Sequence, residues 1–146
     1  MKRIAYLLLA AFTFLAMAAL AQPSAQPLAS WLPKQRWQKR VVLLCAPTAS
    51  EPELRAQQQQ FAAAEAGMQE RDIVVREVLF DQLSAADKQY VTQKLRVNTT
   101  GFTLVLLGKD GGVKRRETQP ITPKSLFQTI DVMPMRREEA RGTGKP

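Results

Sequence analysis

Short apolar runs, separated by polar segments, divide the sequence into strands and helices. Four strands are predicted: three from short runs that are rich in β-branched or large apolar residues and bounded by turn-forming residues, and the fourth from the Asp-Gly turn that precedes it. They span residues 41–45, 73–80, 102–107 and 113–118. The first run, VVLLC, is apolar throughout, which is typical of a strand buried on both faces of a sheet.

The first helix is expected between the first two strands. Ser50 and Glu53 have the spacing of a capping box, and Pro52 fits the first helical turn, where the missing N–H has no helical partner to lose. The helix is expected to end at residues 67–69. Its apolar side consists of three residues at intervals of seven: Leu54, Phe61 and Met68.

Two further helices are predicted from their start signals. Ser84 is a capping residue with an acidic residue three positions later, and Thr122 is followed by proline. The order of elements is therefore β-α-β-α-β-β-α. Helical crossovers favour parallel pairing of the first three strands. The turn at Asp110, Gly111 and Gly112 predicts that the last two strands form an antiparallel hairpin.

The N-terminus has the three parts of a secretory signal. Lys2 and Arg3 precede an uncharged apolar run over residues 4–20, and Ala19 and Ala21 provide the small residues of a cleavage site. We therefore expect cleavage after Ala21, which leaves no transmembrane segment and a periplasmic or secreted protein; an uncleaved N-terminal anchor is the alternative. The predicted divisions are a signal peptide at 1–21, a leader segment at 22–36, one domain at 37–137 and a flexible basic tail at 138–146.

The net charge of +8 falls to +6 when Lys2 and Arg3 are removed with the signal. A basic balance indicates either a solvated surface or binding to anionic glycans or lipid head groups. Lys109 and the basic run 114–116 place several cations on the predicted hairpin, where charge also protects a sheet edge. Nucleic acid is not an expected partner, because aromatic and basic residues are not interleaved.

The residue types present exclude several classes of catalytic site. The chain has no histidine, so Ser–His and Cys–His nucleophile pairs are excluded, together with the commonest metal ligand. Its single cysteine, Cys45, cannot form an internal disulfide. Because Cys45 follows four apolar residues, we expect a buried thiol that packs as a small hydrophobic group. The alternative is a reactive thiol activated by Arg71 or Arg136.

The segment around Asp131 favours structural over catalytic roles. A negative charge at the end of a helix is unfavourable, so we expect Asp131 to form an ion pair with Arg136 or Arg71. No cofactor and no metal ion are expected. Met133 and Met135 lie on either side of Pro134. We expect these two methionines to pack against the sheet; copper(I) binding through their thioethers is the alternative.

Three segments carry a family resemblance: Glu70-Arg71-Asp72 before the second strand, LGKDGGVK at 107–114, and IDVMPMR at 130–136. Together they resemble the bacterial domain-of-unknown-function family 4174, over residues 37–137. The resemblance implies a thioredoxin-like fold, with helices on both faces of the sheet, and export. It implies no established activity.

The chain departs from active thioredoxins at both halves of their redox site. Residues 101–113 resemble a late strand and hairpin of thioredoxins, and the first strand leads into the loop where those proteins carry two cysteines at a helix start. Here that loop reads Ala49-Ser50-Glu51-Pro52, which provides no thiol. Phe102 stands where thioredoxins place the cis-proline that binds extended substrates.

We therefore expect an exported, non-catalytic thioredoxin-like module that binds an unknown protein or an anionic surface ligand. One alternative is a divergent redox protein, a peroxidase or a former of mixed disulfides, that uses Cys45 alone. Another is a basic envelope-surface protein that binds anionic glycan or lipid.

Overall fold

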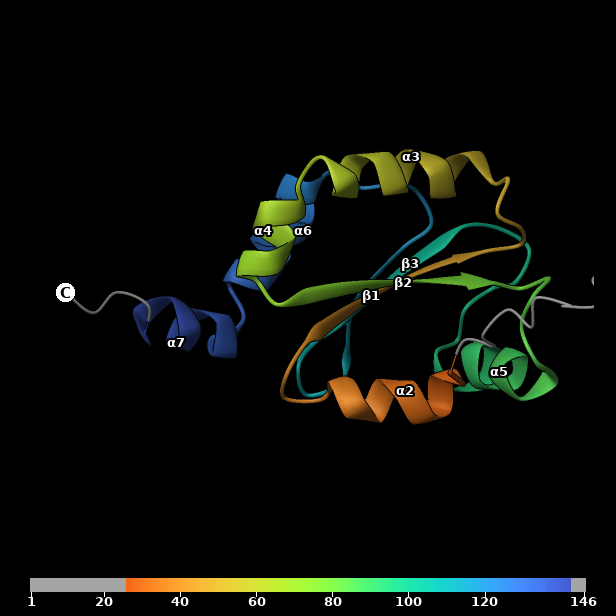
Figure 1. Ribbon diagram of the computed structural model, residues 1–146, viewed down its shortest axis with the longest axis horizontal. Helices are drawn as coiled ribbons and strands as arrows, with labels where there is room; N and C mark the ends of the chain where they lie inside the picture. The colour runs from red at the N-terminus through yellow and green to blue at the C-terminus, as the bar shows by residue number, and fades with distance from the viewer. Residues whose placement is uncertain (1–25, 143–146) are drawn as a thin grey trace, which may run out of the picture.

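A four-stranded sheet forms the centre of the molecule in the computed structural model, which describes residues 26–142 (Figure 1). Its strands are β1 (Arg40–Ala46), β2 (Ile73–Leu79), β3 (Thr103–Leu107) and β4 (Val113–Glu117). Their order in the sheet is β2-β1-β3-β4. β1 pairs in parallel with β2 and antiparallel with β3, and β3 and β4 form the predicted antiparallel hairpin.

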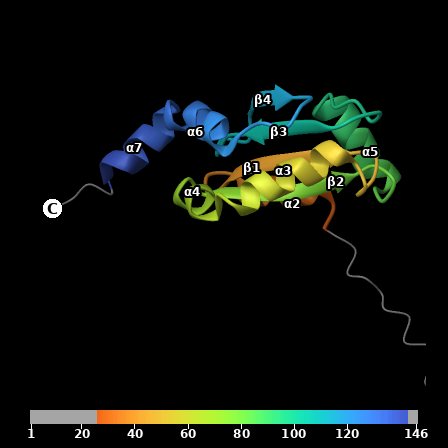
Figure 2. The ribbon, with the colours of Figure 1, turned by 90° about the horizontal axis from the view of Figure 1, so that it is seen from above.

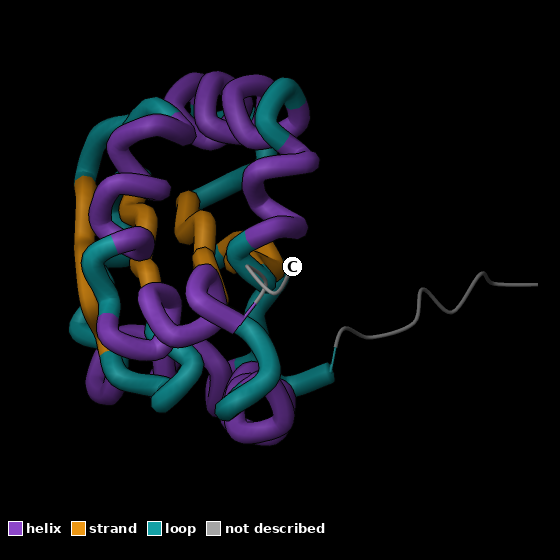
Figure 3. The backbone as a smooth tube through the Cα atoms, turned by 90° about the vertical axis from the view of Figure 1, so that its left-hand side faces the viewer, coloured by secondary structure: helices purple, strands orange, loops and turns teal. Residues whose placement is uncertain are grey.

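Helices cover both faces of this sheet, which confirms the predicted α/β architecture (Figures 1 and 3). One layer contains α3 (Pro52–Ala62), α4 (Glu65–Glu70) and α6 (Pro123–Asp131). The other contains α2 (Leu28–Gln35), α5 (Ala85–Gln89) and the π-helix η1 (Tyr90–Lys94), while α7 (Pro134–Gly142) extends from one end of the sheet. Within residues 26–142, none of these helices has the length and apolarity needed to cross a bilayer.

The prediction that the first three strands are parallel is wrong for β3. The segment formed by α5 and η1 lies below the end of the sheet at which β2 finishes (Figure 1). The chain therefore does not travel back along the sheet before it enters β3. β3 begins at the end where β2 stops and runs in the opposite direction, as its arrow in Figure 2 shows.

β1 divides the apolar core into two halves. Because side chains alternate along a strand, Val41, Leu43 and Cys45 face α2, whereas Val42 and Leu44 face α3 and α6. Every residue of β1 is buried. The predicted strand buried on both faces is therefore confirmed.

The start of the first predicted helix is only partly as expected. Pro52 occupies the first turn, but Glu51 takes the capping position without a side-chain hydrogen bond. The Ser50 hydroxyl instead lies 2.8 Å from the hydroxyl of Thr48, so the expected capping box is absent. The caps predicted for the two later helices, at Ser84 and Thr122, are both present.

The same helix is also interrupted, since α3 ends at Ala62 and α4 begins at Glu65. The break turns α4 toward α6, where Gly67 meets the ring of Phe127. A Cβ atom at Gly67 would come within 2.6 Å of that ring, so a larger residue here would require the Phe127 ring to move. Met68 still reaches the core beside Phe61, as the spacing of seven predicted.

Both ends of the described chain are more ordered than the sequence indicated. Part of the predicted leader forms α2, whose Leu28 and Leu32 are buried in the core. Part of the predicted flexible tail belongs to α7, which carries the buried Arg136. The predicted signal peptide, residues 1–21, and the last four residues of the tail lie outside the described residues.

Candidate functional site

The loop after β1 leads into the start of α3, where the thioredoxin resemblance places a dithiol. Residues 49–52 of this loop contain no sulfur atom. A hollow of about 240 Å³ lies between this helix start and the residues that enter β3, with Glu51, Glu53 and Phe102 among its lining residues. Its lining has no thiol and no imidazole, so it offers neither a sulfur nucleophile nor a histidine base.

The only thiol lies inside the sheet. Cys45 is 0% exposed and pairs with Thr103 across β1 and β3. Burial raises the pKa of the Cys45 thiol to about 12, so the thiolate is scarcely populated at neutral pH. The arginines that the reactive-thiol alternative requires are bound elsewhere: Arg71 contacts Asp131, and Arg136 contacts Glu70. The expectation of a buried thiol is confirmed.

Asp131 forms the predicted ion pair, and it does so with both Arg71 and Arg136. Arg71 binds Asp131 through two nitrogens, with Nε–Oδ1 at 2.8 Å and Nη2–Oδ2 at 2.9 Å. Arg136 Nε lies 3.5 Å from the same carboxylate. The hydrogen bonds from Arg71 lower the pKa of Asp131 below its ordinary value, so the carboxylate stays ionised beside its partners. This is the geometry of a structural clamp between α4 and α6.

A second ionic cluster joins α7 to the beginning of β1. Arg40 is 1% exposed, and its two terminal nitrogens donate to Glu139 at 3.1 and 3.2 Å. Lys109 Nζ lies 2.7 Å from Glu139 and 2.8 Å from Asp72. Burial alone would raise the pKa of Glu139, but the hydrogen bonds from Lys109 and Arg40 outweigh it and lower this pKa.

The roles of Arg40 and Glu139 in this cluster were missed by the sequence analysis. The one signal for Arg40 is a cation placed directly before an apolar strand. Glu139 gives no signal, because its partners Arg40 and Lys109 are distant in the sequence. The hydrogen bond from Lys109 lowers the pKa of Asp72, which also binds Lys39.

The remaining motif residues shape the hairpin and its surroundings. Asp110 Oδ1 accepts a hydrogen bond from the backbone N–H of Gly112, and Lys114 binds the other carboxylate oxygen at 2.6 Å. Gly111 has a φ of 82°, which favours glycine. A hollow of about 320 Å³ brings this turn beside the segment after α6, lined by Arg40, Gly108, Lys109, Asp110, Lys114, Met133, Pro134 and Met135.

Most of the basic hairpin is engaged in contacts within the molecule. Arg115 binds Glu117 and donates to the carbonyl of Ser125 in the first turn of α6, and Arg116 donates to the carbonyl of Leu95. Lys114 is paired with Asp110. These contacts leave fewer cations free for a surface ligand than the sequence indicated.

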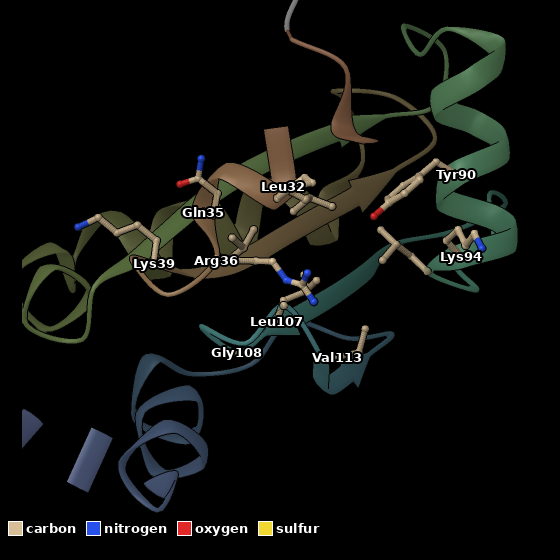
Figure 4. Close-up of a pocket in the computed structure, with 13 residues that line it drawn as sticks. Leu32, Gln35, Arg36, Lys39, Tyr90, Lys94, Leu107, Gly108 and Val113 are labelled. Carbon is tan, nitrogen blue, oxygen red and sulfur yellow. The ribbon is translucent and has the colours of Figure 1, made fainter. Parts of the chain in front are cut away.

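A separate pocket of about 310 Å³ opens on the α2 face of the sheet (Figure 4). Its apolar lining includes Leu32, Val41, Leu95, Leu107 and Val113. Its polar lining comes from two elements, with Gln35, Arg36 and Lys39 at or after the end of α2 and Tyr90 and Lys94 on η1. Sequence reasoning missed this pocket because its walls come from three segments that are distant in the chain, at residues 32–41, 90–95 and 107–113.

A model of a known protein family matches most of the described residues. The model of the domain of unknown function DUF4174 matches residues 31–139. Among curated proteins, the sushi repeat-containing protein SRPX of Rattus norvegicus is 30% identical over 112 residues, which are 69% of this chain and 24% of that protein. SRPX of Mus musculus is 28% identical over the same length. The chain thus spans about a quarter of the length of these relatives.

Solved structures with a thioredoxin-like fold are also similar. Trxlp from Edwardsiella tarda aligns with a TM-score of 0.52 and 22% identity, over 70% of this chain and 91% of Trxlp. The reduced 2-Cys peroxiredoxin of Plasmodium vivax aligns with a TM-score of 0.56 and 12% identity, over 73% of this chain and 84% of the peroxiredoxin. At these identities the likeness shows the fold alone.

Proposed function

The chain belongs to the family of the domain of unknown function DUF4174 and has a thioredoxin-like fold, and we propose that it is an exported binding module without thiol redox activity. One observation carries the proposal. The loop that enters α3 has no thiol, and the single thiol of the chain is buried in β1 with its pKa raised to about 12. A thiolate is the species that attacks disulfides and peroxides, so burial removes the reactive form.

The relatives support a role in binding. In SRPX the matched region is about a quarter of a larger protein, which is named for its sushi repeats. A domain has its own core and folds as a unit, so the same module can serve beside other domains. The pocket between α2 and η1 supplies a concave site for this role.

Two assays test the proposal directly. Insulin reduction by dithiothreitol and peroxide consumption are measured with the wild-type protein and with the Cys45→Ala variant, and an active thioredoxin serves as the positive control. We expect both proteins to give the rate of the reagents alone. Turnover by the wild type that Cys45→Ala abolishes would overturn the proposal in favour of a single-cysteine redox protein.

A further inference from the structure

We propose that the pocket between α2 and η1 binds a small organic anion with a compact apolar body, such as an aryl carboxylate. The inference rests on the proposed binding role and adds the chemical class of the ligand. Three features of the pocket carry it: the sign of its charge, its apolar floor and the placement of Tyr90 and Lys94 by the π-helix.

The charges around the pocket are all positive. Arg36, Lys39 and Lys94 line it, and no lining residue is acidic. Lys39 is paired with Asp72 and its side chain points away from the opening (Figure 4). In the described part of the chain Lys94 has no ion pair, and Arg36 uses only Nε, which donates to the Asp110 carbonyl at 3.1 Å. The terminal nitrogens of Arg36 thus remain for a carboxylate, which a guanidinium binds with two parallel hydrogen bonds.

The floor of the pocket is apolar and belongs to the core. Leu32, Val41, Leu95 and Leu107 are all buried members of the core that faces α2. The volume of about 310 Å³ is at the lower end of the range of small-molecule pockets. An occupant therefore has a short or ring-shaped apolar body against this floor and its charged group at the rim.

The π-helix brings two polar side chains to the same rim. Tyr90 and Lys94 are the first and last residues of η1, and both line the pocket. π-helical turns are rare and recur at functional sites, where the wider turn changes which side chains share a face. Figure 4 shows the Tyr90 ring and the Arg36 guanidinium approaching the opening from opposite sides. Within residues 26–142 the Tyr90 hydroxyl makes no hydrogen bond, so it is available as a donor to an anion.

The test compares a charged probe with its neutral counterpart. Binding of 2-naphthoate and of 2-naphthamide to the purified protein is measured by isothermal titration calorimetry at low and high salt. We expect the anion to bind at least tenfold more tightly than the amide, and its affinity to fall as salt is added. Equal affinities for the two probes, or no binding of 2-naphthoate at millimolar concentration, would overturn the inference.

Variants locate the bound anion. Arg36→Gln and Lys94→Gln are each expected to weaken 2-naphthoate binding about fivefold, and Tyr90→Phe to weaken it by a smaller factor. Lys34→Gln on α2 and Lys88→Gln on α5 are matched controls, because both remove an exposed cation that does not line the pocket. Equal losses in the controls would show a general charge effect and contradict the site. Lys94 is exposed, so its variant keeps the test available if Arg36→Gln disturbs folding.

The two proposals fail separately. Cys45→Ala is expected to leave 2-naphthoate binding unchanged, because Cys45 does not line the pocket. Thiol turnover together with naphthoate binding would overturn the non-redox role alone. Absence of both activities would overturn only the assignment of the pocket.

Discussion

Burial controls the chemistry of Cys45, the single thiol of the chain. A thiol in water ionises near pH 8.5, whereas Cys45 in the folded protein keeps its proton until about pH 12. Between these values the unfolded chain releases a proton that the native protein retains. Alkaline pH therefore favours unfolding through this one residue.

A comparison with Cys45→Ala isolates that contribution. As pH rises above about 9, the free energy of unfolding of the wild type should fall relative to the variant, by up to about 1.4 kcal/mol per pH unit. Urea unfolding of both proteins at several pH values from 8 to 10.5 measures the difference. Tyrosine and lysine titrations occur in both proteins and cancel. Parallel curves would show that the native thiol ionises as readily as the unfolded one.

The contribution of the Asp131 carboxylate to stability depends on pH in the opposite direction, because it is lost at low pH. Its pKa is lowered in the folded protein by Arg71, so its stabilising effect is full above the unfolded pKa and is lost as pH falls through the folded value. We expect Asp131→Asn to lower the free energy of unfolding by about 1 kcal/mol at pH 7, because the carboxylate is partly exposed. Asp81→Asn, at an exposed aspartate, is the control and should change little in the same urea titrations.

At the scale of elements, α7 is held by charge. Glu139 binds Arg40 and Lys109, and Arg40 is almost fully buried at the start of β1. Glu139→Gln would leave this guanidinium buried without its carboxylate, which costs about 3 kcal/mol of unfolding free energy. Glu138→Gln removes the same charge from the exposed neighbouring position and should change stability by less than about 0.5 kcal/mol. Chemical denaturation compares the two, and equal losses would contradict the clamp.

The packing of α2 gives a second test at this scale. Leu28 is fully buried, and its backbone N–H donates to Asp87 at 3.0 Å. Leu28→Ala is therefore expected to lower the free energy of unfolding by about 2–4 kcal/mol, whereas Lys34→Ala on the exposed side of the same helix should change it little. A small effect of Leu28→Ala, measured by thermal and urea unfolding, would mean that residues 28–35 are a dispensable leader.

The elements that the sequence revealed are those with local signals. Apolar runs identify the first three strands, the turn at Asp110 and Gly111 identifies the fourth, and Ser84 and Thr122 identify their helices. α2 was missed because Pro33 lies inside an eight-residue helix and leaves too short an apolar pattern. α7 has a charged sequence, and its stability depends on partners far away in the chain, such as Arg40. The direction of β3 depends on where the preceding helical segment lies, which no local pattern records.

The candidate site likewise has features that the sequence reveals and features that depend on residues far apart in the chain. The absence of histidine and the single cysteine exclude a dithiol and histidine-based catalysis directly from composition. The pairing of Asp131 with Arg71 follows from the position of a carboxylate at a helix end. The pocket beside α2 was beyond sequence reasoning, because Arg36 and Tyr90 approach each other only after the sheet has formed.

At the scale of the whole molecule, the position of the described domain is compatible with export. The first described helix begins at Leu28, so cleavage after Ala21 removes none of the residues in the two halves of the core. A chain cleaved at that position would have a net charge of +6, and a basic chain favours encounters with anionic ligands. Cleavage at that position would therefore leave every residue of the core in the processed chain.

Processing after Ala21 gives the last prediction. Protein recovered from the periplasm or medium of expressing cells should have the intact mass of a chain that begins at Gln22. Ala19→Lys replaces a small residue of the cleavage site by a large charged one, and this variant should remain in the membrane fraction with the mass of the full chain. Ser24→Lys, beyond the site, is the control and should be processed normally. A wild-type chain that keeps Met1 would identify an uncleaved anchor, and the domain would then act at the membrane surface.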